Sequence, residues 1–111
     1  MKPANASQMR DHIKGFIGKL ERYLNKDPMD SAWKKGGKYY FDMDYAIEKK
    51  DDRHIELRTD STLYEIIYDS SSGDWGSIAS KWGSAFRDVV QRYGWIAENR
   101  GGGIIDIVKE R

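Results

Sequence analysis

Cysteine is absent from this chain of 111 residues, and histidine and proline occur only twice each. Without cysteine the chain forms neither disulfides nor thiolate metal sites. His12 and His54 alone leave little for a histidine-based metal site. We therefore expect a core held together by packing, with no metal and no cofactor.

Long apolar stretches are also missing from the sequence. No segment approaches the roughly 18 consecutive apolar residues that a membrane-spanning helix needs. The polar residues 1–5 lack the apolar core of a secretory signal. These two features predict a cytoplasmic protein that has no membrane partner.

Aromatic and charged side chains are abundant by contrast. Hydrophobic residues make up 39% of the chain and charged residues 33%, with four Trp, seven Tyr and three Phe. This composition is too aromatic for a disordered chain. The length leaves room for one hydrophobic core, so we expect residues 1–111 to form a single domain.

A net charge of +1 conceals an uneven distribution of charge along the chain. Residues 1–38 hold nine Lys and Arg against four Asp and Glu, residues 39–70 hold four against nine, and residues 71–111 hold six against five. Charge that separates along the chain is expected to separate in space. The folded surface should therefore have a basic part and an acidic part.

Two segments have the spacing of amphipathic helices. Apolar side chains recur every three or four positions in residues 6–25 and again in residues 75–93. Asn5 or Ser7 can cap the first helix, and Gly94 is placed to end the second.

The segments around the first helix are predicted from their polar and turn-forming residues. We expect residues 1–5 to be a flexible N-terminus. Pro28 and the glycine pair at 36–37 predict a linker over residues 26–37.

Residues 39–48 alternate between apolar and polar side chains, which predicts a strand. Residues 50–52 are typical of a hairpin loop, and a second strand follows. One register keeps the apolar side chains on a single face. It pairs Ile47 with Ile55 and Tyr45 with Leu57.

A second tight turn at residues 60–61 predicts a third strand, so that residues 38–69 form a three-stranded meander. The segments 95–98 and 104–109 flank a glycine-rich turn and predict a C-terminal hairpin over residues 95–109. The fold class is therefore α+β, in the order α-β-β-β-α-β-β. In this arrangement two amphipathic helices pack on one face of an antiparallel sheet.

Both predicted helices carry small residues on one ridge, which lets another backbone approach closely. Either the two helices cross each other or lie close on the sheet within one molecule, or a ridge forms the surface for a partner or for a second copy. Trp33 in the linker is a further candidate for contact. The candidate partner-binding residues are Gly15, Gly18, Gly76, Gly83 and Trp33.

Basic residues offer an alternative, which is contact with nucleic acid. The second helix followed by a glycine-rich hairpin resembles a winged helix, whose wing touches the phosphate backbone. The three-helix core of that family is absent. The candidate nucleic-acid-binding residues are Lys14, Lys34, Lys35, Lys81, Arg87 and Arg100.

A third hypothesis concerns the strand that contains His54, Glu56 and Arg58. These residue types in alternation resemble the acid, base and phosphate-binding groups of small antiparallel-sheet ribonucleases. They are equally typical of a solvated sheet face with cross-strand ion pairs. The same register places Glu56 beside Glu65, which is too small a set of oxygen ligands for a divalent metal.

No reactive constellation stands out from these patterns, whereas the glycine ridges, the aromatic side chains and the separated charge all suit a partner surface. The sequence therefore predicts a small non-enzymatic binding or adaptor protein. It would act through protein–protein contacts, with a homodimer as one form of that contact. No catalytic and no metal-ligating residues are assigned.

Overall fold

The first long helix begins where the sequence supplies a cap. In the computed structural model, which describes residues 3–26, 40–68 and 76–110, helix α1 spans Ala6–Lys26. Asn5 Oδ1 accepts a hydrogen bond from the Gln8 backbone N–H at 2.8 Å, and the Asn5 N–H donates to Gln8 Oε1 at 3.0 Å. This reciprocal pair is a capping box, and it confirms Asn5 as the cap.

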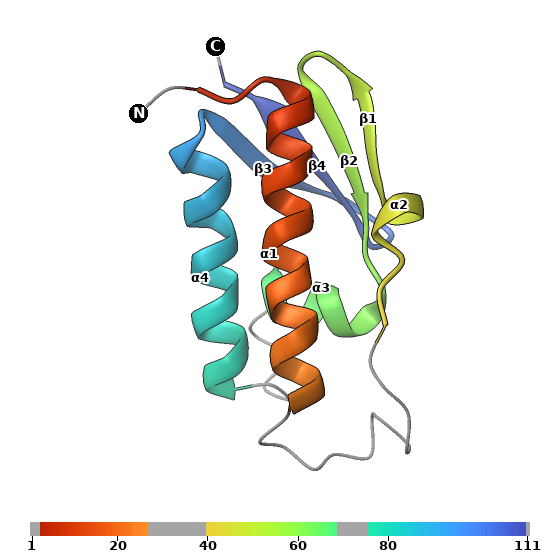
Figure 1. Cartoon of the computed structure of the whole chain (residues 1–111), viewed down its shortest axis with the longest axis vertical. Helices are drawn as coiled ribbons and strands as arrows, with labels where there is room; N and C mark the ends of the chain where they lie inside the picture. The colour runs from red at the N-terminus through yellow and green to blue at the C-terminus, as the bar shows by residue number, and fades with distance from the viewer. Residues whose placement is uncertain (1–2, 27–39, 69–75, 111) are drawn as a thin grey trace.

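The second long helix, α4, spans Gly76–Arg92. It ends at Gly94, whose φ of +85° is a left-handed conformation that favours glycine, and the Gly94 N–H donates to the Gln91 carbonyl at 3.0 Å. Figure 1 shows α1 and α4 side by side and running in opposite directions. Both predicted helices are therefore confirmed.

Two hairpins build one antiparallel sheet with the strand order β1-β2-β4-β3. Strands β2 and β4 pair with each other and join the two hairpins. The C-terminal hairpin is confirmed at its predicted place. The strands are β1 (Ile47–Asp51), β2 (His54–Arg58), β3 (Trp95–Gly101) and β4 (Ile104–Lys109).

The strand predicted over residues 39–48 is wrong in most of its length. Residues Met43–Ala46 form a short helix, α2, and β1 starts only at Ile47. Asp42 caps α2, because its carboxylate accepts from the Tyr45 N–H at 3.3 Å. Tyr45 is 69% exposed, so the alternation of aromatic side chains does not mark a buried face.

The predicted register of the first hairpin is also wrong, by two residues. Ile47 lies opposite Leu57 instead of Ile55, and Glu48 lies opposite Glu56. The turn falls later than expected because the Asp51 carboxylate accepts from the Arg53 N–H at 2.8 Å. A shift of two residues keeps each side chain on its own face, so Ile47 still points to the apolar side.

The third strand of the predicted meander is instead a helix, α3, which spans Ser61–Ile67. Asp60 caps it by accepting from the Leu63 N–H at 2.7 Å. Leu63, Ile66 and Ile67 are buried at spacings of three and four residues, the helical period. Residues 40–68 therefore hold one two-stranded hairpin between two short helices.

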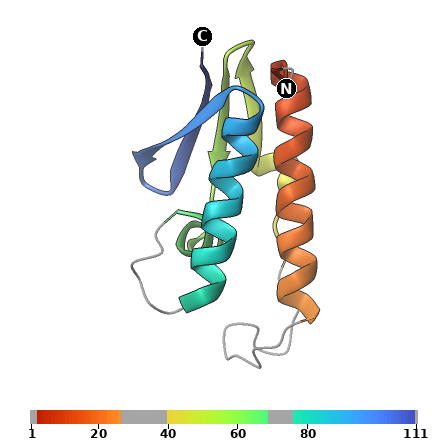
Figure 2. The ribbon, with the colours of Figure 1, turned by 90° about the vertical axis from the view of Figure 1, so that its left-hand side faces the viewer.

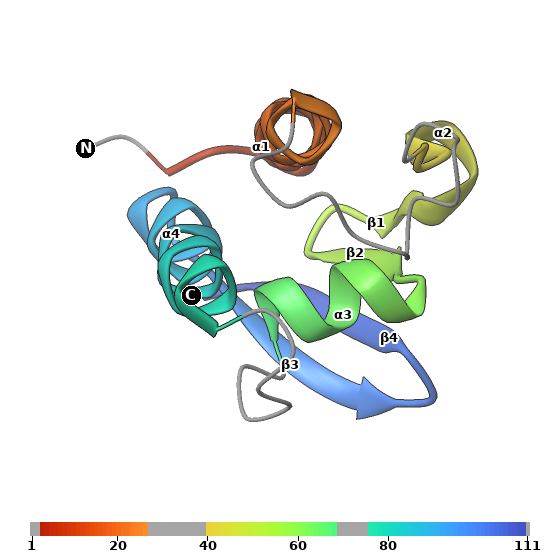
Figure 3. The ribbon, with the colours of Figure 1, turned by 90° about the horizontal axis from the view of Figure 1, so that it is seen from below.

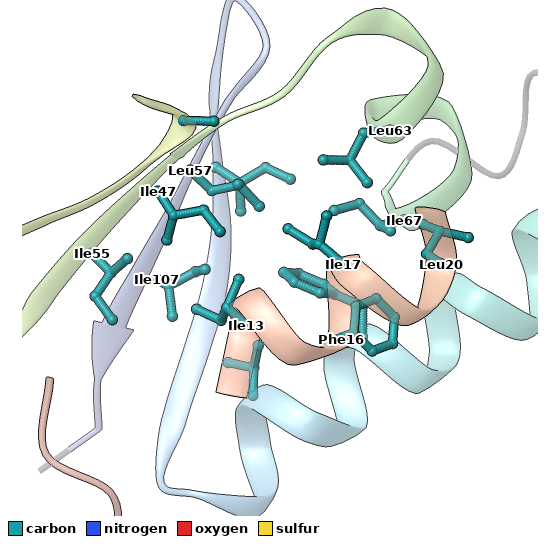
Figure 4. Close-up of a cluster of buried hydrophobic side chains, with 14 of the residues drawn as sticks. Ile13, Phe16, Ile17, Leu20, Ile47, Ile55, Leu57, Leu63, Ile67 and Ile107 are labelled. Carbon is teal, nitrogen blue, oxygen red and sulfur yellow. The ribbon is translucent and has the colours of Figure 1, made fainter. Parts of the chain in front are cut away.

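One face of the sheet carries the core. Figures 2 and 3 show α1 and α4 on the same face, as predicted, and α3 at one end of the sheet. Apolar side chains from the helices and the sheet meet there, as Figure 4 shows. They include Ile13, Ile17 and Leu20 of α1, Ile47, Ile55, Leu57 and Ile107 of the sheet, and Leu63 and Ile67 of α3.

The predicted flexible N-terminus is anchored at Ala4, which is buried. The Ala4 N–H donates to the Tyr93 carbonyl at 3.0 Å, and the Ala4 carbonyl accepts from Trp95 Nε1 at 2.9 Å. The chain is thus fixed to the end of α4 before α1 begins. The linker predicted over residues 26–37 lies outside the described residues, apart from Lys26.

Among the helices of the described residues, none has the length and apolar character needed to cross a membrane. The overall class is the predicted one, an α+β domain with an antiparallel sheet.

Candidate functional site

The face of the sheet opposite the helices carries a row of carboxylates. Cross-strand pairing places Glu48 beside Glu56, Glu56 beside Asp106, and Asp106 beside Glu98. Four like charges on adjacent strands repel each other unless cations lie between them. The arrangement therefore requires basic partners.

Two arginines supply them. The Arg58 guanidinium lies 2.8 Å from both Glu48 Oε1 and Glu56 Oε2. Arg100 Nη2 lies 3.1 Å from Glu56 Oε1 and also contacts Asp106, whose Oδ2 accepts from Arg100 Nε at 2.9 Å. Glu56 is 5% exposed and has an arginine on each side, so the buried carboxylate of the row is neutralised.

These contacts favour the charged form of two of the carboxylates. The hydrogen bond from Arg58 lowers the pKa of Glu48, and Lys50 adds to the effect. The hydrogen bond from Arg100 lowers the pKa of Asp106, with a smaller contribution from His54. Glu48 and Asp106 are therefore ionised at neutral pH.

The hypothesis of a ribonuclease-like site places His54, Glu56 and Arg58 on one face, and the three do share the open face of β2. Sequence reasoning missed the contribution of Asp106, which lies 2.7 Å from His54 Nε2. Both arginines are bound by carboxylates, so a phosphate would have to displace those carboxylates to reach them. The geometry favours a structural ion-pair network over a catalytic site.

The paired carboxylates of Glu56 and Glu65 considered for a metal do not meet, since Glu65 lies on α3 and not on a third strand. Within residues 3–26, 40–68 and 76–110, no group of three or more histidine or acidic side chains could hold a metal ion.

A second surface lies between α1 and α4 on the side away from the sheet. Three adjoining hollows of about 240, 320 and 300 Å³ follow one another between the two helices. The first and second share Phe16 and Val89, and the second and third share Lys19 and Trp82. We call this continuous surface the α1–α4 groove.

The floor of the α1–α4 groove is aromatic. Trp82 packs edge-on against Phe16 at 5.6 Å between ring centroids, and Tyr23 packs on its other side at 5.4 Å. At the far end His12 stacks on Tyr93 at 3.9 Å. Trp82 and Val89 are only half-buried, so apolar surface remains open in the groove.

The rim of the groove is basic at one end. Lys19, Arg22, Lys26 and Lys81 are all exposed there, and none of them forms an ion pair with a carboxylate of the described residues. At the other end Asp11 lines the groove, and in the middle hollow Asp88 binds Arg92 at 2.6 Å. The unbalanced positive charge therefore gathers toward the end of α1.

The three glycines of the predicted partner surface that can be placed lie in different surroundings. Gly15 lines the groove, and a Cβ added there would meet no atom within 4 Å. Gly83 packs instead against α3, where a Cβ would lie 3.3 Å from the Ile66 carbonyl oxygen. Gly18 is buried beside Arg22.

Two further candidates from the sequence cannot be placed on this surface. Gly76 is the first residue of α4, but its surroundings are not described. Trp33 lies outside the described residues.

The residues predicted to contact nucleic acid do not form one surface. Lys81 lines the groove, while Lys14 binds Asp44 at 3.3 Å and Arg100 lies on the opposite face of the sheet among carboxylates. Arg87 is exposed on α4 and lines none of the three hollows of the groove. Lys34 and Lys35 lie outside the described residues.

The sequence analysis placed Phe16, Trp82 and Val89 only within the apolar stripes of the two helices and did not predict the groove. The feature of the sequence that could have indicated the groove is the width of the apolar face of α1. Phe16 and Tyr23 flank its buried positions 13, 17, 20 and 24. No protein-family model, no curated protein and no solved structure matches this chain.

Proposed function

We propose that this chain is a small, non-enzymatic, cytoplasmic binding protein that holds an acidic segment of another protein in its α1–α4 groove. The observation that supports the proposal is the combination of an open aromatic floor with four exposed cations on its rim, Lys19, Arg22, Lys26 and Lys81. Aromatic side chains supply most of the energy of protein interfaces, and surrounding charges select the partner.

A homodimer through the same surface is disfavoured by charge. If two grooves met in parallel, two clusters of four cations without carboxylate partners among the described residues would come together. If they met antiparallel, each cluster would face only Asp11 and the already paired Asp88 of the other copy. A partner that carries Asp and Glu beside apolar side chains satisfies both the floor and the rim.

The test compares partners retained from a cell extract by the wild-type chain and by two variants. The double substitution Lys19→Glu and Lys81→Glu reverses the charge of the rim, whereas Arg87→Glu makes the same change on α4 away from the hollows of the groove. We expect proteins that are retained by the wild type and by Arg87→Glu to be lost with the double variant. Equal retention by all three, with unchanged circular dichroism, would contradict the proposal.

Nucleic acid is the competing ligand for a basic surface, and the same chain can be titrated against duplex DNA and RNA. Binding through phosphates weakens steeply between about 50 and 200 mM salt. Tight, salt-dependent binding to either duplex would favour the nucleic-acid alternative. We expect none, because those of the predicted basic residues that the structure describes are divided between opposite faces.

A further inference from the structure

The dimensions of the α1–α4 groove limit what can occupy it. Its lining begins at Asp11 and ends at Lys26 on α1. With a rise of about 1.5 Å per residue, this stretch of α1 is about 22 Å long. An occupant that covers the floor must therefore have about the same length.

The backbone of the groove offers an occupant no hydrogen bonds. Both walls are helices, whose interior N–H and C=O groups already bind each other. An extended segment would leave its own backbone groups unpaired over an apolar floor, at a cost of about 1–3 kcal/mol for each buried group. A helix satisfies its own backbone and can bury one apolar face between α1 and α4.

The position of the charges defines the polar flank of such a helix. Three cations, Lys19, Arg22 and Lys26, surround the hollow beside Trp82, and Lys81 adds a fourth from α4. The opposite end holds Asp11, and the middle hollow holds Asp88, whose charge is paired with Arg92. Carboxylates on the occupant are therefore favoured over the Trp82 end and not over the other.

Trp82 also provides an unused hydrogen-bond donor. Its indole Nε1 is buried, and no acceptor for it lies within the part of the chain that the structure describes. A buried donor without a partner destabilises a protein by about 1–3 kcal/mol. A helix that packs against the Trp82 ring would change the surroundings of this N–H.

From these observations we infer that the natural occupant of the groove is an amphipathic helix of about four turns, with acidic residues concentrated over the Trp82 end. The inference rests on the proposed function and names the form of the partner. The helix lies between α1 and α4 as a third helix, with its apolar side chains on Phe16, Trp82 and Val89.

The test uses fluorescent synthetic peptides of about 15 residues, the length that spans the groove. The first peptide has leucines at helical spacing and glutamates on the flanks toward one end. Three matched peptides change one property each, by a central proline, by scrambled leucine spacing, or by lysine in place of glutamate. Fluorescence polarisation at moderate salt measures their affinities for the full chain.

The helical acidic peptide is expected to bind at least about tenfold more tightly than each of the other three. The Lys19→Glu and Lys81→Glu double variant should weaken this binding by about tenfold, and Arg87→Glu should change it less than twofold. Equal binding of the proline peptide, or no binding of the helical peptide, would overturn the inference.

The peptide result and the extract result separate the two proposals. If partners from the extract depend on the rim but the helical peptide does not bind, the groove remains a protein-binding site and only the helical form of the partner is wrong. If neither depends on the rim, both proposals fail.

Discussion

Glu56 shows how a single residue organises the open face of the sheet. Its carboxylate is almost completely buried between Arg58 of its own strand and Arg100 of β3. The two guanidinium groups remain 32% and 43% exposed, so water weakens each ion pair. Their main effect is to neutralise a carboxylate that would otherwise be buried without a partner.

Replacing Glu56 with alanine should therefore destabilise the protein by about 1–3 kcal/mol, because Arg58 and Arg100 lose a shared acceptor and packing is lost. Glu98 is the matched control, since it belongs to the same row but is exposed on the edge strand. Glu98→Ala should change stability by less than about 0.5 kcal/mol. Urea unfolding measures both, and equal effects would contradict the assigned role of Glu56.

The lowered pKa of Asp106 predicts a loss of stability in acid. The hydrogen bond from Arg100 keeps the folded pKa below the unfolded value of about 3.9, so the unfolded chain binds the proton first as pH falls. The stabilisation is complete above that value and disappears as pH drops from about 4 toward the folded pKa.

Asp106→Asn removes this titrating group without changing its size. The variant should be less stable than the wild type at pH 6 and should lose less stability between pH 6 and pH 2.5. Urea midpoints across this range test the prediction. Parallel curves for the two proteins would show that Asp106 does not contribute to the acid dependence.

Among the elements, the long helices were predictable and the short ones were not. Residues 6–26 repeat the helical spacing over five turns. Residues 61–67 are too few to distinguish the helical spacing of three to four residues from the two-residue alternation of a strand. The turn expected at residues 60–61 suggested a third strand, but Asp60 caps a helix whose buried residues are Leu63, Ile66 and Ile67. Local capping outweighed the alternation of side chains.

The candidate groove was only partly predictable, for a similar reason. The sequence placed Gly15, Lys81 and the basic N-terminal third on helix surfaces, but the way in which α1 and α4 pack leaves Trp82 and Val89 partly open. The spacing of hydrophobic residues indicates which face of a helix is buried, but not how far neighbouring elements cover the edges of that face. The groove exists because the edges of the apolar faces of α1 and α4 are only partly covered.

The glycines of the two helices give a matched stability test. Gly15→Ala should stabilise the protein by about 0.5–1 kcal/mol, since alanine favours helix and a Cβ has free space there. Gly83→Ala gains the same propensity but presses a Cβ against two carbonyl groups of α3, at 3.3 and 3.4 Å. Thermal unfolding should therefore rank the Gly15 variant well above the Gly83 variant, and the reverse order would contradict the packing of α3 on Gly83.

The whole molecule presents two charged surfaces of opposite design. On the open face of the sheet, Arg58 and Arg100 pair with three of the four carboxylates in the row. On the helical side, four cations of the α1–α4 groove, Lys19, Arg22, Lys26 and Lys81, have no acidic partner among the described residues. Charge that is already paired contributes to stability, whereas charge without a partner around an open apolar floor is suited to an external ligand.

The most direct measurement is the nuclear magnetic resonance signal of the Trp82 indole N–H during titration with the acidic helical peptide. Trp95 provides an internal control, because its indole is buried and already donates to the Ala4 carbonyl. We predict that the Trp82 signal shifts while the Trp95 signal stays in place. A shift of the backbone signals of Glu98 and Asp106, with the Trp82 signal unchanged, would place the ligand on the sheet and contradict binding in the α1–α4 groove.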